Sequence, residues 1–291
     1  MLAGVLVPAL TRPFASVLEG LVALMLFLTA LRIGPAAALR AMRGGAAPML
    51  GLTVALQTGA PLGALAVMWP FGWQSTVPGI GVVLALAAAP ILGAPAVALL
   101  ARADPLPALR SMVVGTALLP LTALPVFWVL PVFGGAAQVL EGAARLLVLI
   151  GFAGGAGLAL RAALPGLEGS RPAAALDGLT ALAMTGLIMG LIAGLGPGLR
   201  ADPVGVVVLL SGLCVLVFGS QLVTFALLRR GGAGGLAAPL AIGAGNRNLA
   251  LFLPALPPEL AAALMVFVGA YQVPMFLTPA LLIRLYRTAA P

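Results

Sequence analysis

The residues best suited to bind a ligand lie in two short stretches that interrupt apolar, membrane-length segments. The segment Gly243-Ala-Gly-Asn-Arg-Asn248 places Arg247 where the middle of a bilayer would be, with Asn246 and Asn248 on either side. A guanidinium is permanently charged and presents donors in a planar fork that suits carboxylates and sulfonates. An unpaired charge near the bilayer centre costs several kcal/mol, so Arg247 is expected to have a partner.

The second interruption is Ala-Ala-Pro-Ile-Leu-Gly-Ala-Pro at 88–95. A helix that faces lipid cannot carry such breaks, because the freed backbone groups have no water to bond. Broken helices survive where they line a cavity, and a pair in corresponding halves points to the binding site of a transporter. The residues expected to break the helices are Pro90, Gly93, Pro95, Gly243 and Gly245.

Other chemistry is poorly supported by the residue types. The chain has no His, and its one cysteine, Cys214, lies in an apolar run. An ordinary zinc or haem site is therefore excluded, and we predict no metal and no cofactor. No nucleophile–base pair is apparent, so an enzyme is the least expected class. Glu19 is the only carboxylate considered for proton coupling, whereas Glu141 and Arg145 are spaced for a structural ion pair.

The composition is that of a polytopic membrane protein. Of 291 residues, 62% are hydrophobic and 8% charged, and the mean hydropathy is +1.19. Soluble domains carry about 25% charged residues. All 15 basic residues are arginines, and the formal net charge is +8. They are spread between apolar segments instead of forming a basic face, so nucleic-acid binding is excluded.

The apolar segments predict an all-α integral membrane protein with about nine transmembrane helices, since about 20 apolar residues cross a bilayer. The expected spans are 14–31, 48–69, 78–101, 108–131, 137–160, 174–195, 204–228, 237–256 and 260–286. An odd number suggests two inverted five-helix repeats, with the first helix of the first repeat missing or reduced to residues 1–11.

The arginines predict the orientation. With the N-terminus outside, the inner side receives eleven of them, at positions 32, 40, 43, 102, 110, 161, 171, 229, 230, 284 and 287. Only Arg12 and Arg200 fall on the outer side. The positive-inside rule therefore predicts an outside N-terminus and a cytoplasmic C-terminus. The expected location is the inner (plasma) membrane of a bacterium.

Five motifs occur in order along these spans. They are Leu18–Arg32, a first span with Gly and Met; Gln57-Thr-Gly-Ala-Pro61; Ala89-Pro90-Ile-Leu-Gly-Ala; Leu100-Ala-Arg-Ala-Asp104; and Gly245-Asn-Arg-Asn-Leu-Ala250. In these motifs the chain resembles the bile acid:sodium symporter superfamily over nearly its whole length. It looks like a divergent nine-span bacterial-type member.

The resemblance implies two domains and alternating access. A core domain would hold the helices in about 48–131 and 204–286, including two broken helices that cross near the midplane. A panel domain would hold about 14–31, 137–160 and 174–195. Substrate would bind in the crevice between them.

The chain departs from the family at the sodium ligands. The family's Ser-Asn pair reads Pro95-Ala96, its Glu position reads Ala241, and its Gln position reads Gly245. Only Gln57 and Asn246 match the polar residues of the family. We therefore predict transport that is not coupled to sodium, with Arg247 as the replacement for the cation or as a direct substrate contact.

The predicted function is a secondary transporter of a small organic anion, with the lipid bilayer as its other partner and the oligomeric state left open. Alternatives are a transporter of a neutral or zwitterionic metabolite, a sodium symporter that uses backbone carbonyls, and a non-transporting scaffold or sensor. Buried amides in membranes either bridge helices or contact substrate. The candidate substrate-binding residues are Arg247, Asn246, Asn248, Gln57, Gln272, Thr116 and Gln221.

Overall fold

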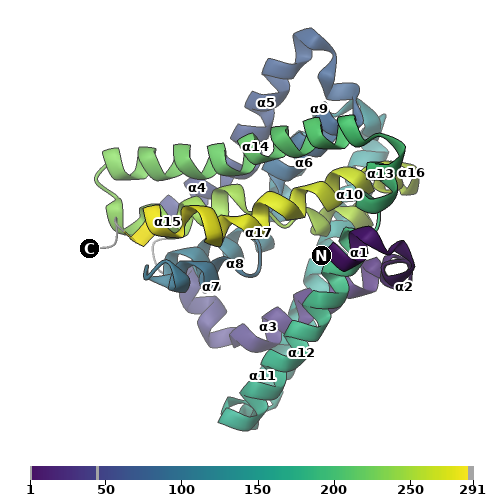
Figure 1. The fold of residues 1–291 in the computed structure, drawn as a ribbon. Coiled ribbons are helices and arrows are strands. Elements are labelled where there is room, and N and C mark those ends of the chain that lie inside the picture. The colour runs from purple at the N-terminus through teal and green to yellow at the C-terminus, as the bar shows by residue number, and fades with distance from the viewer. Residues whose placement is uncertain (1, 44–45, 288–291) are drawn as a thin grey trace.

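A computed structural model describes residues 2–43 and 46–287 of the chain (Figure 1). These residues form helices and their connections, and the one β-type pairing found among them is an isolated bridge between Pro90 and Arg247. Seven of the described helices are long and apolar enough to cross a membrane, and two shorter apolar helices, Val77–Ala87 and Gly234–Gly245, accompany them. The prediction of an all-α integral membrane protein is supported at this level.

The first half of the chain begins with short elements, α1 (Leu2–Leu6), η1 (Pro8–Leu10) and α2 (Arg12–Ala15). Residues 2–11 thus contain no spanning helix, and Met1 lies outside the described residues. The helices that follow are α3 (Leu18–Arg43), α4 (Ala46–Val54), the π-helix η2 (Ala55–Gly59), α5 (Ala60–Met68), η3 (Trp69–Phe71), η4 (Trp73–Ser75), α6 (Val77–Ala87), α7 (Ala94–Leu100), α8 (Pro105–Thr122), α9 (Leu124–Val129) and η5 (Pro131–Phe133).

The second half of the chain also consists of long helices joined by short helical elements. Its elements are α10 (Ala136–Leu149), the π-helix η6 (Ile150–Gly154), α11 (Gly155–Ala163), η7 (Pro165–Glu168), α12 (Ser170–Leu191), α13 (Leu195–Ala201), α14 (Pro203–Arg230), α15 (Gly234–Gly245), the 3₁₀ helix η8 (Leu249–Ala255), α16 (Pro258–Ala263) and α17 (Met265–Arg287).

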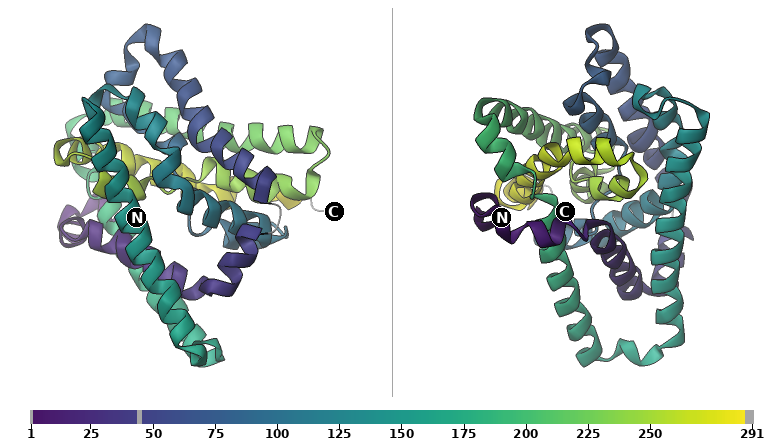
Figure 2. Two further views of the ribbon diagram at one scale, coloured as in Figure 1. Left: turned by 180° about the vertical axis from the view of Figure 1, so that it is seen from behind. Right: turned by 90° about the vertical axis from the view of Figure 1, so that its right-hand side faces the viewer.

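Two groups of helices meet at the middle of the molecule. In one, α3 lies between α11 and α12 and contacts both, as the right-hand view of Figure 2 shows. In the other, α14 runs beside α15 and α17, while α7 and α8 pack against α15 (Figure 1). The buried apolar core extends through both groups and includes large side chains such as Phe127, Phe252 and Phe267.

Helix α3 differs from the expected span 14–31. It begins at Leu18 and continues to Arg43, with a kink at Gly34, whose backbone has φ 72°. The next residue is Pro35, which disfavours helical geometry in the residue before it, and glycine adopts a positive φ without steric cost. Proline also suits the first turn of a helix, so 36–43, rich in alanine, resumes as a helix instead of a loop.

The later start of α3 changes the place of Glu19. This carboxylate lies in the first turn of α3 and is exposed, instead of a turn and a half inside the span. The expected pair of Glu141 and Arg145 is confirmed, with Oε1 and Nη2 2.6 Å apart. Both groups are exposed, so this pair contributes little to stability.

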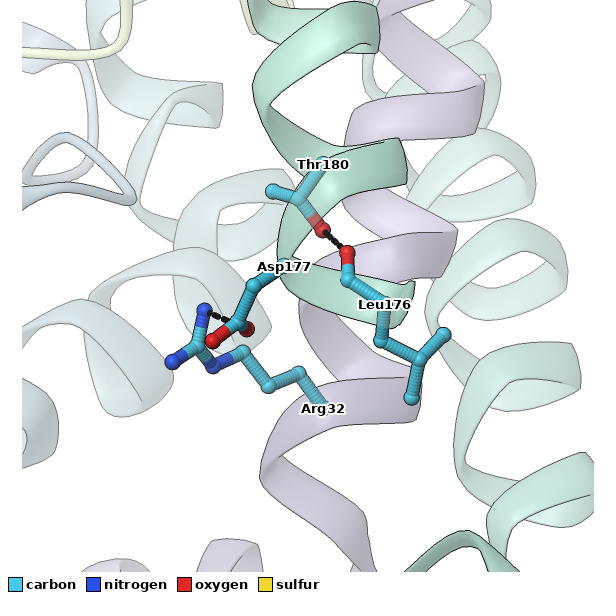
Figure 3. Close-up of polar contacts among 4 residues, drawn as sticks. All are labelled: Arg32, Leu176, Asp177 and Thr180. Carbon is cyan, nitrogen blue, oxygen red and sulfur yellow. Dashed lines mark hydrogen bonds and ion pairs between the residues drawn. The ribbon is translucent and has the colours of Figure 1, made fainter. Parts of the chain in front are cut away.

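A second ion pair joins two helices of one group. Arg32 of α3 bonds Asp177 of α12, and about half of each side chain stays exposed (Figure 3). Thr180, one turn further along α12, donates to the carbonyl oxygen of Leu176 at 2.7 Å. At the other group, the guanidinium of Arg287 donates to Leu100 O at 3.0 and 3.1 Å, which joins the end of α17 to the end of α7. An arginine within α3 and one at the end of α17 thus contact neighbouring helices.

Candidate functional site

The two interrupted helices cross at their breaks and bond each other there. Helix α6 ends at Ala87 and α7 begins at Ala94, whereas α15 ends at Gly245 and η8 begins at Leu249. Between them, Ile91 N donates to Asn246 O at 2.9 Å and Asn248 N donates to Ala89 O at 2.7 Å. Each extended strand-like segment therefore supplies the hydrogen bonds that the other lost when its helix stopped.

The predicted break residues divide between the breaks and the adjoining helices. Pro90 and Gly93 lie in the first interruption. Pro95 lies in the first turn of α7, where a proline needs no hydrogen bond for its missing N–H. Gly243 and Gly245 are the last glycines of α15. The second interruption consists of residues 246–248, so Pro95, Gly243 and Gly245 flank the breaks instead of forming them.

Arg247 is fixed at the crossing by both interrupted helices. Its Nη1 donates to Ala88 O at 2.9 Å, and its Nε donates to Ala244 O at 2.8 Å. Those carbonyls belong to the C-terminal ends of α6 and α15, where the unpaired carbonyls and the helix dipole both favour a cation. The residue is 3% exposed. The guanidinium therefore joins the two half-helices and cannot leave the crossing without loss of both bonds.

No carboxylate among the described residues pairs with this guanidinium. Within the described part of the chain the two ion pairs are Arg32–Asp177 and Arg145–Glu141, both far from the crossing in the sequence. Among the same residues, Nη2 of Arg247 forms no hydrogen bond. A buried charge without a counter-charge is costly. The Nη2 group of Arg247 is therefore the donor that a ligand would bond.

A pocket lies beside the crossing. Arg247, Asn248 and Gln272 supply its polar wall, and the remaining wall is apolar, from α3, α12, α17, η8 and the first break. The Gln272 amide donates back to Val268 O, and its Oε1 accepts no hydrogen bond from the described residues. The side chain of Asn248 likewise forms no hydrogen bond within that part of the chain. The pocket therefore combines uncommitted polar groups with an apolar wall, between the two helix groups.

Two further donors stand in the same wall. Leu249 and Ala250 begin the 3₁₀ helix η8, and their amides form no backbone hydrogen bond within the described residues. Free N–H groups at a helix start favour a negative charge.

Three candidates lie behind the crossing, away from this pocket. Gln57 donates to Gly115 O at 3.1 Å and accepts from Thr122 Oγ1 at 2.9 Å, which ties the π-helix η2 to α8. Gln221, a residue of α14, is fully buried where α14 packs against α17. Asn246 is also fully buried, and its Oδ1 accepts from Thr278 at 3.0 Å. These three amides hold helices together in this structure.

The remaining candidate, Thr116, lies on α8 in the wall of a different pocket. The seven candidate residues are therefore not gathered at one place. Arg247, Asn248 and Gln272 share the pocket at the crossing, whereas Gln57, Asn246 and Gln221 are used between helices.

Thr278 and Tyr286 of α17, which the sequence reasoning missed, complete the network behind the crossing. The Gln221 amide donates to Thr278 Oγ1 at 3.0 Å and accepts from Tyr286 Oη at 2.9 Å. Tyr271, Thr278 and Tyr286 are spaced by seven and eight residues, which puts them on one helix face about two turns apart. That spacing was the available signal for a polar face directed toward the crossing.

The side chain of Tyr271 bonds the backbone just before and within the second break. Its hydroxyl accepts from Arg247 N at 3.1 Å and donates to Gly245 O at 2.8 Å. The residue is 1% exposed. One hydroxyl thus satisfies a donor and an acceptor that the end of α15 leaves unpaired.

Replacing Tyr271 with phenylalanine is expected to lower the free energy of unfolding by about 2–4 kcal/mol, because two buried backbone groups lose their partner. The measurement is the melting temperature of the purified protein in detergent. Tyr286→Phe is the matched control on the same helix, since that hydroxyl forms one hydrogen bond among the described residues, to Gln221. A Tyr271→Phe protein that melts at no lower temperature than the control would show that the Tyr271 hydroxyl does not stabilise the break.

No known family model matches the chain, and no curated protein matches it in sequence. The fold and the site therefore stand on the residues themselves, and the resemblance to the bile acid:sodium symporters remains a hypothesis.

Proposed function

We propose that this protein is a secondary transporter of a small organic anion, built as the bile acid:sodium symporter resemblance implies. The observation that carries the proposal is Arg247, a buried guanidinium at the wall of a pocket between two helix groups. It has no carboxylate partner in the part of the chain that the structure describes. A carboxylate or sulfonate would supply the missing negative charge.

The division into core and panel domains fits this reading. The pocket lies between α3 and α12 on one side and the crossing on the other. These are helices of the proposed panel and core. The two short apolar helices and their continuations past the breaks would bring the seven long helices to nine passes, with an outside N-terminus. The described helix α17 ends at Arg287, and residues 288–291 lie outside the described part of the chain.

We propose that sodium does not drive this transport. The carbonyl oxygens of Ala88 and Ala244, at the two breaks, are bonded to the guanidinium. A sodium symporter that lacks side-chain ligands for the ion would have to bind it with backbone carbonyls at the breaks. With a fixed positive charge among them, a second cation at that place would be repelled.

A second candidate is a transporter of a neutral or zwitterionic metabolite. Its supporting observation is that Arg247 already bonds two backbone carbonyls, which gives it a structural role without any ligand. In that case a charged ligand and its uncharged analogue would bind alike.

The test of both is a thermal-shift screen of detergent-purified protein. The panel consists of monocarboxylates and sulfonates with aliphatic or aromatic bodies, each paired with its uncharged amide, in sodium and in potassium buffer. A ligand that binds only the folded state raises the melting temperature with its concentration. We expect an anion to stabilise the protein equally in both buffers while its amide does not. Stabilisation only in sodium would contradict the absence of sodium coupling, and equal stabilisation by acid and amide would favour the second candidate.

A further inference from the structure

Exposed arginines gather at the ends of three helices. Helix α14 ends with Arg229 and Arg230, the last turn of α17 carries Arg284 and Arg287, and Arg102 lies two residues past the end of α7. All of these side chains are exposed. Figure 1 shows the ends of α14 and α17 on the left side of the molecule. Two helices thus bring four arginines to one end of the described structure.

Side-chain contacts join these helix ends. The rings of Phe225 and Tyr286 lie 5.3 Å apart, and the Arg229 guanidinium lies 5.7 Å from the centre of the Phe225 ring. The residue after Tyr286 is Arg287, which donates to Leu100 O at the end of α7. One continuous set of contacts therefore runs from α14 through α17 to α7, and Arg102 lies two residues beyond its last member.

Arg102 adopts a backbone conformation that suits glycine. Its φ is 58°, the one positive value at a non-glycine among the described residues. Ala103 N donates to Ala98 O at 3.0 Å, and Arg102 N donates to Leu99 O at 2.9 Å. This hydrogen-bond pattern ends many helices, usually with glycine at the left-handed position. The left-handed conformation costs an L-residue more than an exposed charge near a helix end usually returns. The helix dipole alone therefore does not account for a cation here.

No acidic side chain of the described residues pairs with these arginines, since both ion pairs found there lie elsewhere. The nearest carboxylate in the sequence, Asp104, caps α8, where its Oδ1 accepts from Leu106 N at 2.9 Å. Arg32 of α3, by contrast, has Asp177 as its partner. The helix ends therefore carry a strong net positive charge. We call this region the arginine surface, and its members are Arg102, Arg229, Arg230, Arg284 and Arg287.

Exposed leucines lie beside the same arginines. Leu99 and Leu100 come directly before Arg102 in the turn, Leu227 lies near the end of α14, and Leu281 lies one turn before Arg284 on α17. Each of these leucines is more than half exposed. The ends of α7, α14 and α17 thus each present apolar side chains next to positive charge. A ligand that fits this surface has an anionic head and an apolar body, whereas a free phosphate ion would satisfy the arginines alone.

We propose that the arginine surface binds an anionic phospholipid, with Arg102 and Arg287 on its phosphate and the exposed leucines against its acyl chains. Arg287 is held in place because Nε and Nη2 both donate to Leu100 O, and its Nη1 has no partner within the described ranges. Guanidinium groups bind phosphate through charge-assisted hydrogen bonds. Basic groups at a membrane surface attract anionic lipids. This site lies at the membrane surface and does not rest on the proposed transport function.

The test measures the melting temperature of the whole protein in lipid nanodiscs. Phosphatidylcholine is replaced stepwise by phosphatidylglycerol, because a lipid that binds only the folded state raises the melting temperature. The variant Arg102→Gly removes the charge and suits the left-handed backbone, so its folding is not impaired. The matched control is Arg40→Gln, since Arg40 is an exposed arginine in the last turn of α3, and the positive-inside rule places it on the same side of the membrane.

We expect phosphatidylglycerol to stabilise the wild-type and Arg40→Gln proteins alike. In phosphatidylcholine alone, Arg102→Gly should melt at the wild-type temperature or above it. It should need about fivefold more phosphatidylglycerol than wild type for half of the rise, because one arginine near the lipid surface is lost. Arg287→Gln should need a similar excess.

Three results would overturn the proposal. The first is a wild-type protein that phosphatidylglycerol does not stabilise, or an Arg102→Gly protein that it stabilises equally. The second is an equal loss in Arg40→Gln, which would indicate general attraction to a basic surface instead of a site. The third comes from adding inorganic phosphate or glycerol phosphate to protein in phosphatidylcholine. Stabilisation as strong as that by the lipid would indicate a site for a free anion instead.

Discussion

Arg247→Ala is expected to weaken binding of the anion identified by thermal shift by more than about 30-fold. Removal of one partner from a buried, hydrogen-bonded charge pair costs about 2–5 kcal/mol. The substitution also frees Ala88 O and Ala244 O, which the guanidinium occupies at 2.9 and 2.8 Å. The measurement is the dissociation constant by titration calorimetry on protein that elutes as a single species.

Two further variants separate charge from fold. Arg247→Lys keeps the positive charge, but an ammonium cannot bond both carbonyls and also present a planar edge to the pocket, so we expect binding at least about tenfold weaker. Arg145→Ala is the matched control, because this arginine also lies within an apolar span but is exposed and paired with Glu141. Wild-type affinity in a folded Arg247→Lys or Arg247→Ala protein would contradict direct anion contact.

Gly245→Ala is expected to lower the stability of the protein substantially, because the added methyl group has no room at the crossing. A Cβ at this position would lie 2.3 Å from Val217 O and 2.4 Å from Cγ of Gln221. Since one of these neighbours is backbone, α14 and α15 would have to separate at the crossing. Overpacking of this kind costs about 3 kcal/mol, and the expected result is a melting temperature lowered by roughly 5–10 °C.

The matched control is Gly235→Ala in the same helix, where a Cβ would meet nothing within 4 Å. It should leave the melting temperature unchanged or raise it slightly, because alanine is a better helix former than glycine. If the two alanine variants melt together, α14 and α15 are not in close contact at Gly245.

The interruptions were predictable because they contrast with their surroundings. Arginine, asparagine and proline stand out within segments that are otherwise apolar, and the bilayer makes each of them costly unless it is paired. The charge of Arg247 and the places of both breaks could thus be read from the residue types. Their mutual pairing, between Ile91 and Asn246 and between Asn248 and Ala89, depends on segments more than 150 residues apart.

The sequence does not show which of the other polar residues join helices and which face the pocket. In a soluble helix the polar face marks the solvent, but helices in a bilayer are apolar on the lipid side and often on the buried side too. Gln57 and Gln272 therefore look alike in the sequence. Only their partners distinguish them, since Gln57 bonds α8 on both amide ends and Gln272 faces the pocket.

The extent of α3 was misjudged because charge was taken as the end of the helix. Arg32 follows an apolar run, but it pairs with Asp177 of α12, and the chain turns only at Gly34. A helix can continue past a charged residue when a neighbouring helix supplies the counter-charge.

The most direct test of the central claim is uptake of the identified anion into proteoliposomes, with and without an imposed sodium gradient at fixed membrane potential. If Arg247 is the resident cation of an anion site, wild-type protein transports the anion at the same rate in both conditions and the Arg247→Lys protein transports little. Uptake that rises steeply with the sodium gradient, or that persists without Arg247, would contradict it.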